Sequence, residues 1–128
     1  MIDYLTFYLF TCIILIHYIA DFPFQTSEMA LNKSKCNKAL DNHVRVYSSV
    51  VCILSAIFIF YVLQVSFIWL LLYLIYTYVT HFGTDYVTSR LCSKYFSKQD
   101  YHMGFVIVGV DQCIHFLTTI TFFALIAS

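Results

Sequence analysis

Four long apolar stretches dominate this chain of 128 residues. We expect each of them to form a membrane-spanning helix, because a bilayer requires about 20 mainly apolar residues per span. The predicted spans cover residues 4–20, 44–63, 67–87 and 104–127. Only residues 64–66 separate the second span from the third, so these two helices should form a tight hairpin.

The composition excludes an ordinary water-soluble fold. The chain is 61% hydrophobic and 11% charged, whereas a typical soluble domain carries about 25% charged residues. A chain of this length could not bury so much apolar surface in a single water-exposed globule. We therefore predict an all-α integral membrane four-helix bundle, with residues 1–128 forming a single transmembrane domain. The lipid bilayer is its expected partner, and so small a bundle is a candidate homo-oligomer.

Two connections join the predicted spans on one side of the membrane. In residues 21–43, Pro23 disfavours helix at the residue before it, and Thr26 or Ser27 could then cap a short helix running toward Leu40. That helix would lie in the membrane interface, and the alternative is a plain polar loop. The second connection, residues 88–103, carries Arg90 and two lysines.

The basic residues predict the orientation of the bundle. All seven Lys and Arg lie in or beside the two connections, namely Lys33, Lys35, Lys38, Arg45, Arg90, Lys94 and Lys98. Positive charge favours the cytoplasmic side of a membrane, so we expect both termini outside. The formal net charge is zero, and no concentrated basic surface suggests a nucleic-acid partner.

Histidine and aspartate occur together in or at the ends of these apolar stretches. Three pairs are spaced four residues apart, so each pair shares one face of a helix: His17 and Asp21, His81 and Asp85, and Asp111 and His115. An aspartate at the centre of a membrane helix costs about 2.5–3.5 kcal/mol on insertion scales. On the predicted topology these pairs and His43 reach one level near the cytoplasmic face, carried by all four helices.

The order and spacing of these residues resemble a known family. The pattern His17-x-x-x-Asp21-Phe22-x-x-Gln25-Thr26, then His43, His81-Phe82-x-x-Asp85 and Asp111-Gln112-x-x-His115 resembles the DUF3307 family of small bacterial and phage membrane proteins. The resemblance spans nearly the whole chain and implies a place in the bacterial inner membrane. More distantly, the pattern is similar to membrane-bound metal-dependent hydrolases, which also place His and Asp at helix ends.

Imidazole and carboxylate together are typical ligands of divalent metals. They suit Zn, Mn or Fe, and carboxylate also suits Mg. The seven predicted ligands are His17, Asp21, His43, His81, Asp85, Asp111 and His115. Seven candidate ligands are more than the four that a closed zinc site uses, so the site could hold one ion or two. Two ions would lie roughly 3.5–4 Å apart. Gln25 and Gln112 are candidates to orient the ligands.

The position of this predicted site suggests its chemistry. A metal at the cytoplasmic surface of the membrane would meet lipid headgroups, and basic residues nearby would attract anions. We therefore expect a metal-dependent hydrolase acting on a phosphoester or lipid-linked substrate, with an amphiphilic phosphate-containing molecule as its ligand. The sequence names neither the substrate nor the metal.

Two other functions fit the same residues. Ionisable groups inside membranes also mark ion pathways, so the chain could be a divalent-cation or proton transporter or channel. It could instead be a non-enzymatic phage or bacterial membrane factor whose polar cluster only fixes helix packing. His102 follows a polar segment and is expected at the surface, not among the ligands. The five cysteines have no Cys-x-x-Cys spacing and are expected to be free thiols.

Overall fold

A computed structural model describes residues 3–127 of the chain, and within them every regular element is a helix. The elements are α1 (Tyr4–Asp21), α2 (Ser27–Asn32), α3 (Asn37–Ser55), a π-helical turn η1 (Ala56–Phe60), α4 (Tyr61–Leu63), α5 (Phe67–Ser97) and α6 (Tyr101–Ala127). Because α3, η1 and α4 follow one another without a break, four rods are long and apolar enough to cross a membrane. The predicted all-α fold with four candidate spans is confirmed.

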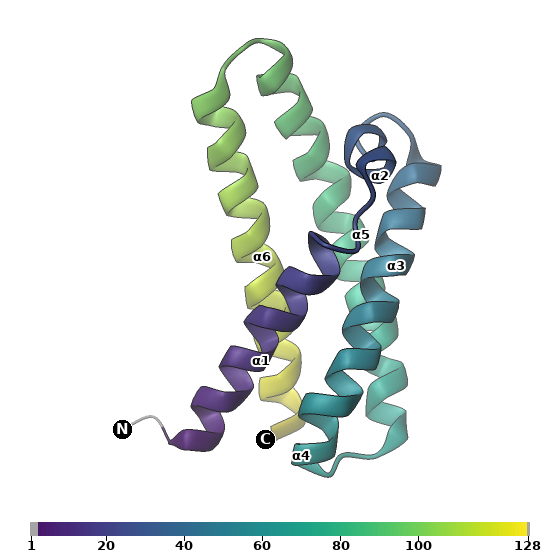
Figure 1. The fold of residues 1–128 in the computed structure, drawn as a ribbon, viewed down its shortest axis with the longest axis vertical. Coiled ribbons are helices and arrows are strands. Elements are labelled where there is room, and N and C mark those ends of the chain that lie inside the picture. The colour runs from purple at the N-terminus through teal and green to yellow at the C-terminus, as the bar shows by residue number, and fades with distance from the viewer. Residues whose placement is uncertain (1–2, 128) are drawn as a thin grey trace.

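The four rods run alternately up and down (Figure 1). The described ends of α1 and α6 lie at the same end of the bundle as α4 and the turn that leads into α5. The α2 segment lies toward the opposite end, where the tip of the α5–α6 hairpin extends beyond α1 and α3. We call the first the terminal end and the second the hairpin end.

The connection between α1 and α3 contains a short helix. The side chain of Thr26 accepts a hydrogen bond from the Met29 amide, at 3.2 Å, and so caps α2 as predicted. The helix is only six residues long and ends at Asn32, well before Leu40. A turn then leads to α3, which begins at Asn37, seven residues earlier than the predicted span.

The second connection is much shorter than predicted. Helix α5 continues to Ser97, ten residues past the predicted end of its span, and α6 begins at Tyr101. Neither proline nor glycine occurs between Gly83 and Gly104 to stop the helix, and the chain turns at Gln99, which adopts a left-handed conformation with φ of 60°. Arg90 therefore lies on a helix, with its guanidinium 3.8 Å from the centre of the Tyr86 ring.

Threonine hydroxyls on α5 are satisfied within the helix. Thr77, Thr80 and Thr84 each donate to the carbonyl four residues earlier, at 2.8–2.9 Å. A hydroxyl paired with its own backbone does not need water. This pairing lets a threonine-rich helix lie within an apolar bundle.

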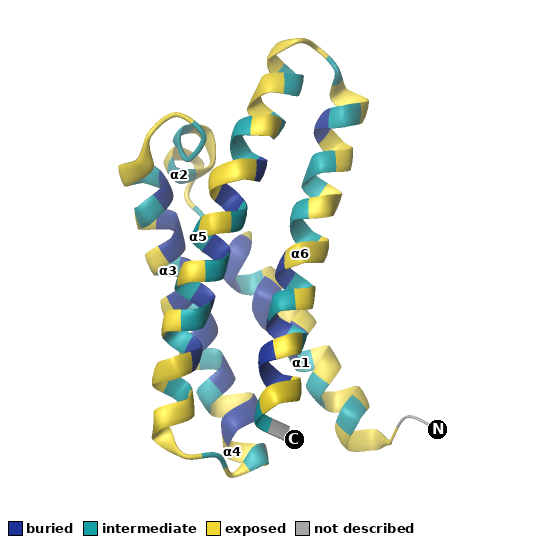
Figure 2. Cartoon of the chain, turned by 180° about the vertical axis from the view of Figure 1, so that it is seen from behind, coloured by how far each residue is buried: buried dark blue, intermediate teal, exposed yellow. Residues whose placement is uncertain are grey.

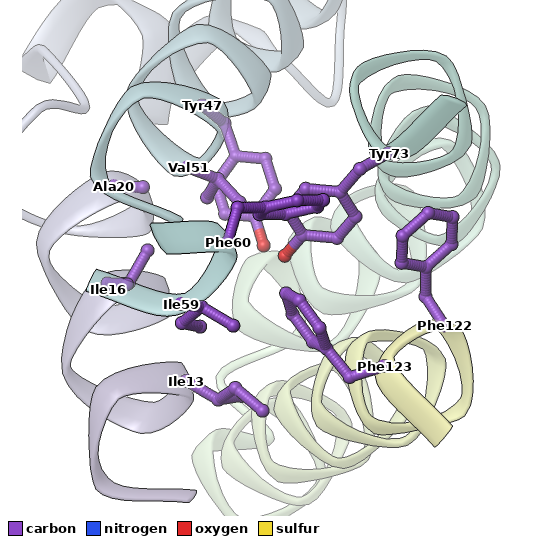
Figure 3. Packing of buried hydrophobic residues seen from close by; sticks show 10 residues of the cluster. All are labelled: Ile13, Ile16, Ala20, Tyr47, Val51, Ile59, Phe60, Tyr73, Phe122 and Phe123. Atoms are coloured by element: carbon purple, nitrogen blue, oxygen red, sulfur yellow. The ribbon is translucent and has the colours of Figure 1, made fainter. Parts of the chain in front are cut away.

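The apolar core fills the terminal end of the bundle. Its members come from every rod and are Ile13, Ile16, Ala20, Tyr47, Val51, Ile59, Phe60, Tyr73, Phe122 and Phe123 (Figure 3). The outward faces of the rods are largely exposed (Figure 2), with large apolar side chains such as Phe7, Ile75 and Leu117 more than 60% exposed. An apolar outer surface of this kind fits lipid contact.

Candidate metal centre

Five of the seven predicted ligands form two buried triads that share one histidine. The first triad consists of Asp21 of α1, His43 of α3 and His81 of α5. The second consists of His81 together with Asp85 of α5 and His115 of α6. Each of these side chains is buried, with at most 4% of its residue surface exposed. The convergence of all four rods expected from the sequence is therefore present in the fold.

The donor atoms of the first triad have the spacing of metal ligands. His43 Nε2 lies 3.2 Å from Asp21 Oδ1 and 3.2 Å from His81 Nε2, while His81 Nε2 and Asp21 Oδ1 are 3.6 Å apart. Ligands about 2.0–2.1 Å from a tetrahedral ion lie about 3.3–3.4 Å from one another. These three residues therefore fit a zinc-like ion without rearrangement of the helices.

Asp85 connects the two triads. Its Oδ1 lies 3.1 Å from His115 Nε2 and 3.6 Å from His81 Nε2. Its Oδ2 lies 3.3 Å from His43 Nε2, in the first triad. The two triads are therefore parts of a single cluster, which we call the His/Asp cluster: Asp21, His43, His81, Asp85 and His115.

Stacked rings hold the shared histidine in place. The His81 ring lies between the rings of Tyr47 and His115, with centroid distances of 3.7 and 4.0 Å and interplanar angles of 19° and 16°. Tyr47 is buried and was not identified from the sequence. Tyr47 follows His43 by four residues, so both side chains lie on one face of α3. This spacing is the feature of the sequence that points to Tyr47.

His17 lies beside the cluster in a hydrogen-bonded chain. Its Nδ1 is 2.9 Å from the Tyr47 hydroxyl, and its Nε2 is 2.9 Å from the carbonyl oxygen of Gln112. The carbonyl can only accept, so His17 Nε2 donates to it and Nδ1 is left to accept from Tyr47 in the neutral ring. Both ring nitrogens are thus engaged, and the role of His17 as a ligand stays a prediction.

Gln112 joins His17 to two carboxylates. Its amide nitrogen donates to Asp21 Oδ2 at 3.0 Å and to Asp111 Oδ2 at 3.1 Å. Asp111 also accepts from the Thr88 hydroxyl, and its Oδ1 lies 3.5 Å from His115 Nε2. Gln112 therefore has the contacts expected of a residue that orients ligands. Asp111 lies within reach of the cluster but in neither triad, so its ligand role also stays a prediction.

A cavity of about 210 Å³ opens beside the cluster. Its polar lining includes Asp21, Gln25, Lys33, Ser89, Asp111 and Gln112. Phe22, Ala30 and Ile107 contribute apolar wall. The side-chain oxygens of Gln25 and Ser89 are buried without a hydrogen-bond partner. Unpaired buried oxygens at a cavity wall leave polar groups free for water or a ligand.

Lys33 also belongs to the site, although the sequence identifies it only as one of the basic residues of the first connection. It follows α2, and its Nζ donates to Asp85 Oδ2 at 2.7 Å. Burial disfavours the charged ammonium, but the neighbouring Asp85 and Asp21 carboxylates outweigh this and raise the pKa of Lys33. Nothing in the spacing of the sequence signals this contact, which spans 52 residues. His102, by contrast, is exposed in the first turn of α6, as expected.

Comparison with known proteins gives one result. The family model described as "Protein of unknown function (DUF3307)" matches residues 9–128, which is nearly the whole chain. No curated protein and no solved structure matches the chain significantly.

Proposed function

The chain belongs to the DUF3307 family, and we propose that it is a membrane-embedded, metal-dependent hydrolase acting on a phosphoester or lipid-linked substrate. The observation that carries the proposal is the cavity that opens on Asp21, Asp111 and Gln112. Structural zinc sites are closed by four protein ligands, whereas catalytic sites keep a position open to water or substrate. A buried cluster with a cavity at its edge matches the second kind.

Under this proposal the residues of the cluster and those beside it have different roles. Asp21, His43 and His81 would hold a divalent ion, with Asp85 at its other side, and Gln112 would fix the Asp21 carboxylate. An ion bound there supplies an activated water and stabilises negative charge that develops at phosphorus. Lys33 contributes a positive charge at the cavity wall, where an anionic headgroup would lie.

The shape of the cavity supports an amphiphilic substrate. Its lining combines a lysine and two glutamines with apolar wall from Phe22 and Ile107. A second cavity shares Ala30, Lys33, Ser89 and Cys92 with it and extends to Lys35 and Ser97. Because they share these residues, the two cavities adjoin, the first beside the cluster and the second toward Lys35 and Ser97. A phosphate headgroup on a lipid tail suits such a pair of cavities.

A one-sided site also agrees with the position of the core. Ile13, Ile59 and Phe123 pack together with the other core residues (Figure 3), and each lies nearer the terminal end along its rod than the cluster residues of that rod. A transporter would need a hydrated path through that region. The packing therefore favours hydrolysis over transport. We further propose that the hairpin end, which carries the basic connector residues, faces the cytoplasm in the bacterial inner membrane.

The test is phosphate release by the purified protein. In detergent micelles with Zn²⁺ or Mn²⁺, the wild type should release inorganic phosphate from dioctanoyl phosphatidic acid, and a chelator should abolish the release. His81→Ala should be inactive, while His102→Ala, which changes an exposed histidine outside the cluster, should retain full activity. Protein that holds its metal but releases neither inorganic phosphate from phosphomonoesters nor the alcohol from phosphodiesters, with every metal tried, would remove hydrolysis from the proposal.

A further inference from the structure

Lys33 brings a positive charge into a cluster of carboxylates. Its ammonium lies 2.7 Å from Asp85 Oδ2, the side chain of Lys33 is 17% exposed, and that of Asp85 is 1% exposed. Asp85 is also the carboxylate that connects the two triads. Lys33 therefore contacts the cluster where a second metal ion, bridged by Asp85, would otherwise bind.

The charges around the cluster limit what it can hold. Asp21, Asp85 and Asp111 carry three negative charges when ionised, and they are buried or largely buried. Lys33 supplies one positive charge and a single divalent ion supplies two, so the set is then neutral. A second divalent ion would leave a net positive charge inside an apolar bundle, where uncompensated charge is costly.

The arrangement of the histidines leads to the same limit. His81 belongs to both triads, but a neutral imidazole offers a single lone pair to a metal. Only one of the two triads can therefore use His81 at a time, so a second ion would depend on His115 with Asp85 and Asp111, whose Oδ1 atoms lie 3.1 and 3.5 Å from His115 Nε2. Lys33 acts on this second position, because Asp85 Oδ2 already accepts the Lys33 hydrogen bond.

We propose that the centre binds one divalent ion per chain and that the Lys33 ammonium takes the place of a second metal. This inference rests on the metal site of the proposed function but goes beyond it, because hydrolysis itself requires neither a particular ion count nor a lysine. Lys33 is then the residue that determines the metal stoichiometry, and its position after α2 couples that connector to the spanning helices.

The test is the number of ions bound at saturation. Purified chain, stripped of metal and equilibrated with excess Zn²⁺, should hold one ion per chain by elemental analysis after removal of free metal. Lys33→Met should hold two, because Asp85 Oδ2 becomes available and the excess positive charge of a two-ion site falls from two units to one, which a metal-bound hydroxide would neutralise. Lys33→Arg, which keeps the charge, and Lys35→Met, which changes an exposed lysine two residues away, should each hold one.

Several results would overturn the inference. These are two ions in the wild type, or one ion in a folded Lys33→Met variant. If Lys33→Met does not fold, the wild-type and Lys33→Arg counts decide the question, and two ions in either contradict it. A chain that binds one ion but hydrolyses nothing would overturn only the hydrolase. A chain that binds none would overturn both.

Discussion

The Nε2 atoms of His43 and His81 face each other across 3.2 Å, and each lies within 3.6 Å of Asp21 Oδ1. That carboxylate oxygen is buried and has no hydrogen-bond partner of good geometry. The other oxygen of Asp21 accepts from Gln112, but a buried carboxylate oxygen without a well-formed hydrogen bond carries a desolvation cost. A cation between these three atoms would offset that cost, so metal binding would satisfy the one oxygen of Asp21 that the surrounding helices leave without a hydrogen bond.

Gln112 offers a test of how the ligands are oriented. It contacts His17, Asp21 and Asp111 but would not itself bind the ion. We expect Gln112→Leu to weaken metal affinity by about 10–100-fold, the usual effect of losing a residue that positions ligands. Competition with a chromophoric chelator measures this affinity. Cys113→Ser, at the neighbouring exposed position, is the control, and equal affinities in the two variants would contradict the orienting role.

Tyr47 has two separable contributions to stability. Tyr47→Phe removes only the hydroxyl that contacts His17, so the free energy of unfolding should fall by about 1 kcal/mol. Tyr47→Ala also removes the ring stacked on His81, and the loss should be about 3–5 kcal/mol. Unfolding titrations in mixed micelles with sodium dodecyl sulfate measure both. Similar losses for the two variants would mean that the stacked ring contributes little.

Cys36 provides a chemical probe of orientation. It is exposed at the start of α3, where the nearby backbone amides of Ala39 and Lys38 lower the pKa of its thiol. A larger thiolate fraction makes a cysteine react faster with electrophiles. If the hairpin end is cytoplasmic, a membrane-impermeant maleimide should modify Cys36 only after the cells are permeabilised.

The control for orientation is a cysteine at the opposite end. Gln64→Cys, introduced in a Cys36→Ser background, places a thiol in the exposed turn before α5. It should be modified in intact cells. Labelling of Cys36 in intact cells, with protection at position 64, would reverse the proposed topology.

The main features of the fold follow from the sequence because membrane helices leave a strong signal. Four apolar stretches of sufficient length predict four rods. Residues four positions apart lie on the same face of a helix, so the spacing of His81 and Asp85 predicts that they share a face. The helix ends were less predictable. Residues 88–97 are polar enough to suggest a connection, yet they contain no helix breaker and the helix continues through them.

The composition of the site was predictable in part, for a physical reason. Histidine and aspartate inside apolar helices stand out because their burial is costly. Lys33 and Tyr47 do not, since a lysine in a connector and a tyrosine in a membrane helix are both common. Their roles depend on contacts between distant segments, and only the three-dimensional arrangement reveals these contacts.

Transport is the function most directly opposed to a one-sided site. We expect vesicles reconstituted with the chain to take up Zn²⁺ no faster than empty vesicles, because packed side chains such as Phe60 and Phe123 lie between the cluster and the terminal end. An entrapped zinc-sensitive dye measures this uptake. Uptake that depends on His81 would show that the cluster lies on an ion pathway and would replace hydrolysis with transport.

The central claim is that the His/Asp cluster binds a metal, and the metal content of the purified protein tests it most directly. The wild type should contain close to one transition-metal ion per chain, His81→Ala should contain almost none, and His102→Ala should match the wild type. The account would be contradicted by a folded wild-type protein that holds no ion even after incubation with Zn²⁺, Mn²⁺ or Fe²⁺. It would be contradicted equally by a metal content that His81→Ala leaves unchanged.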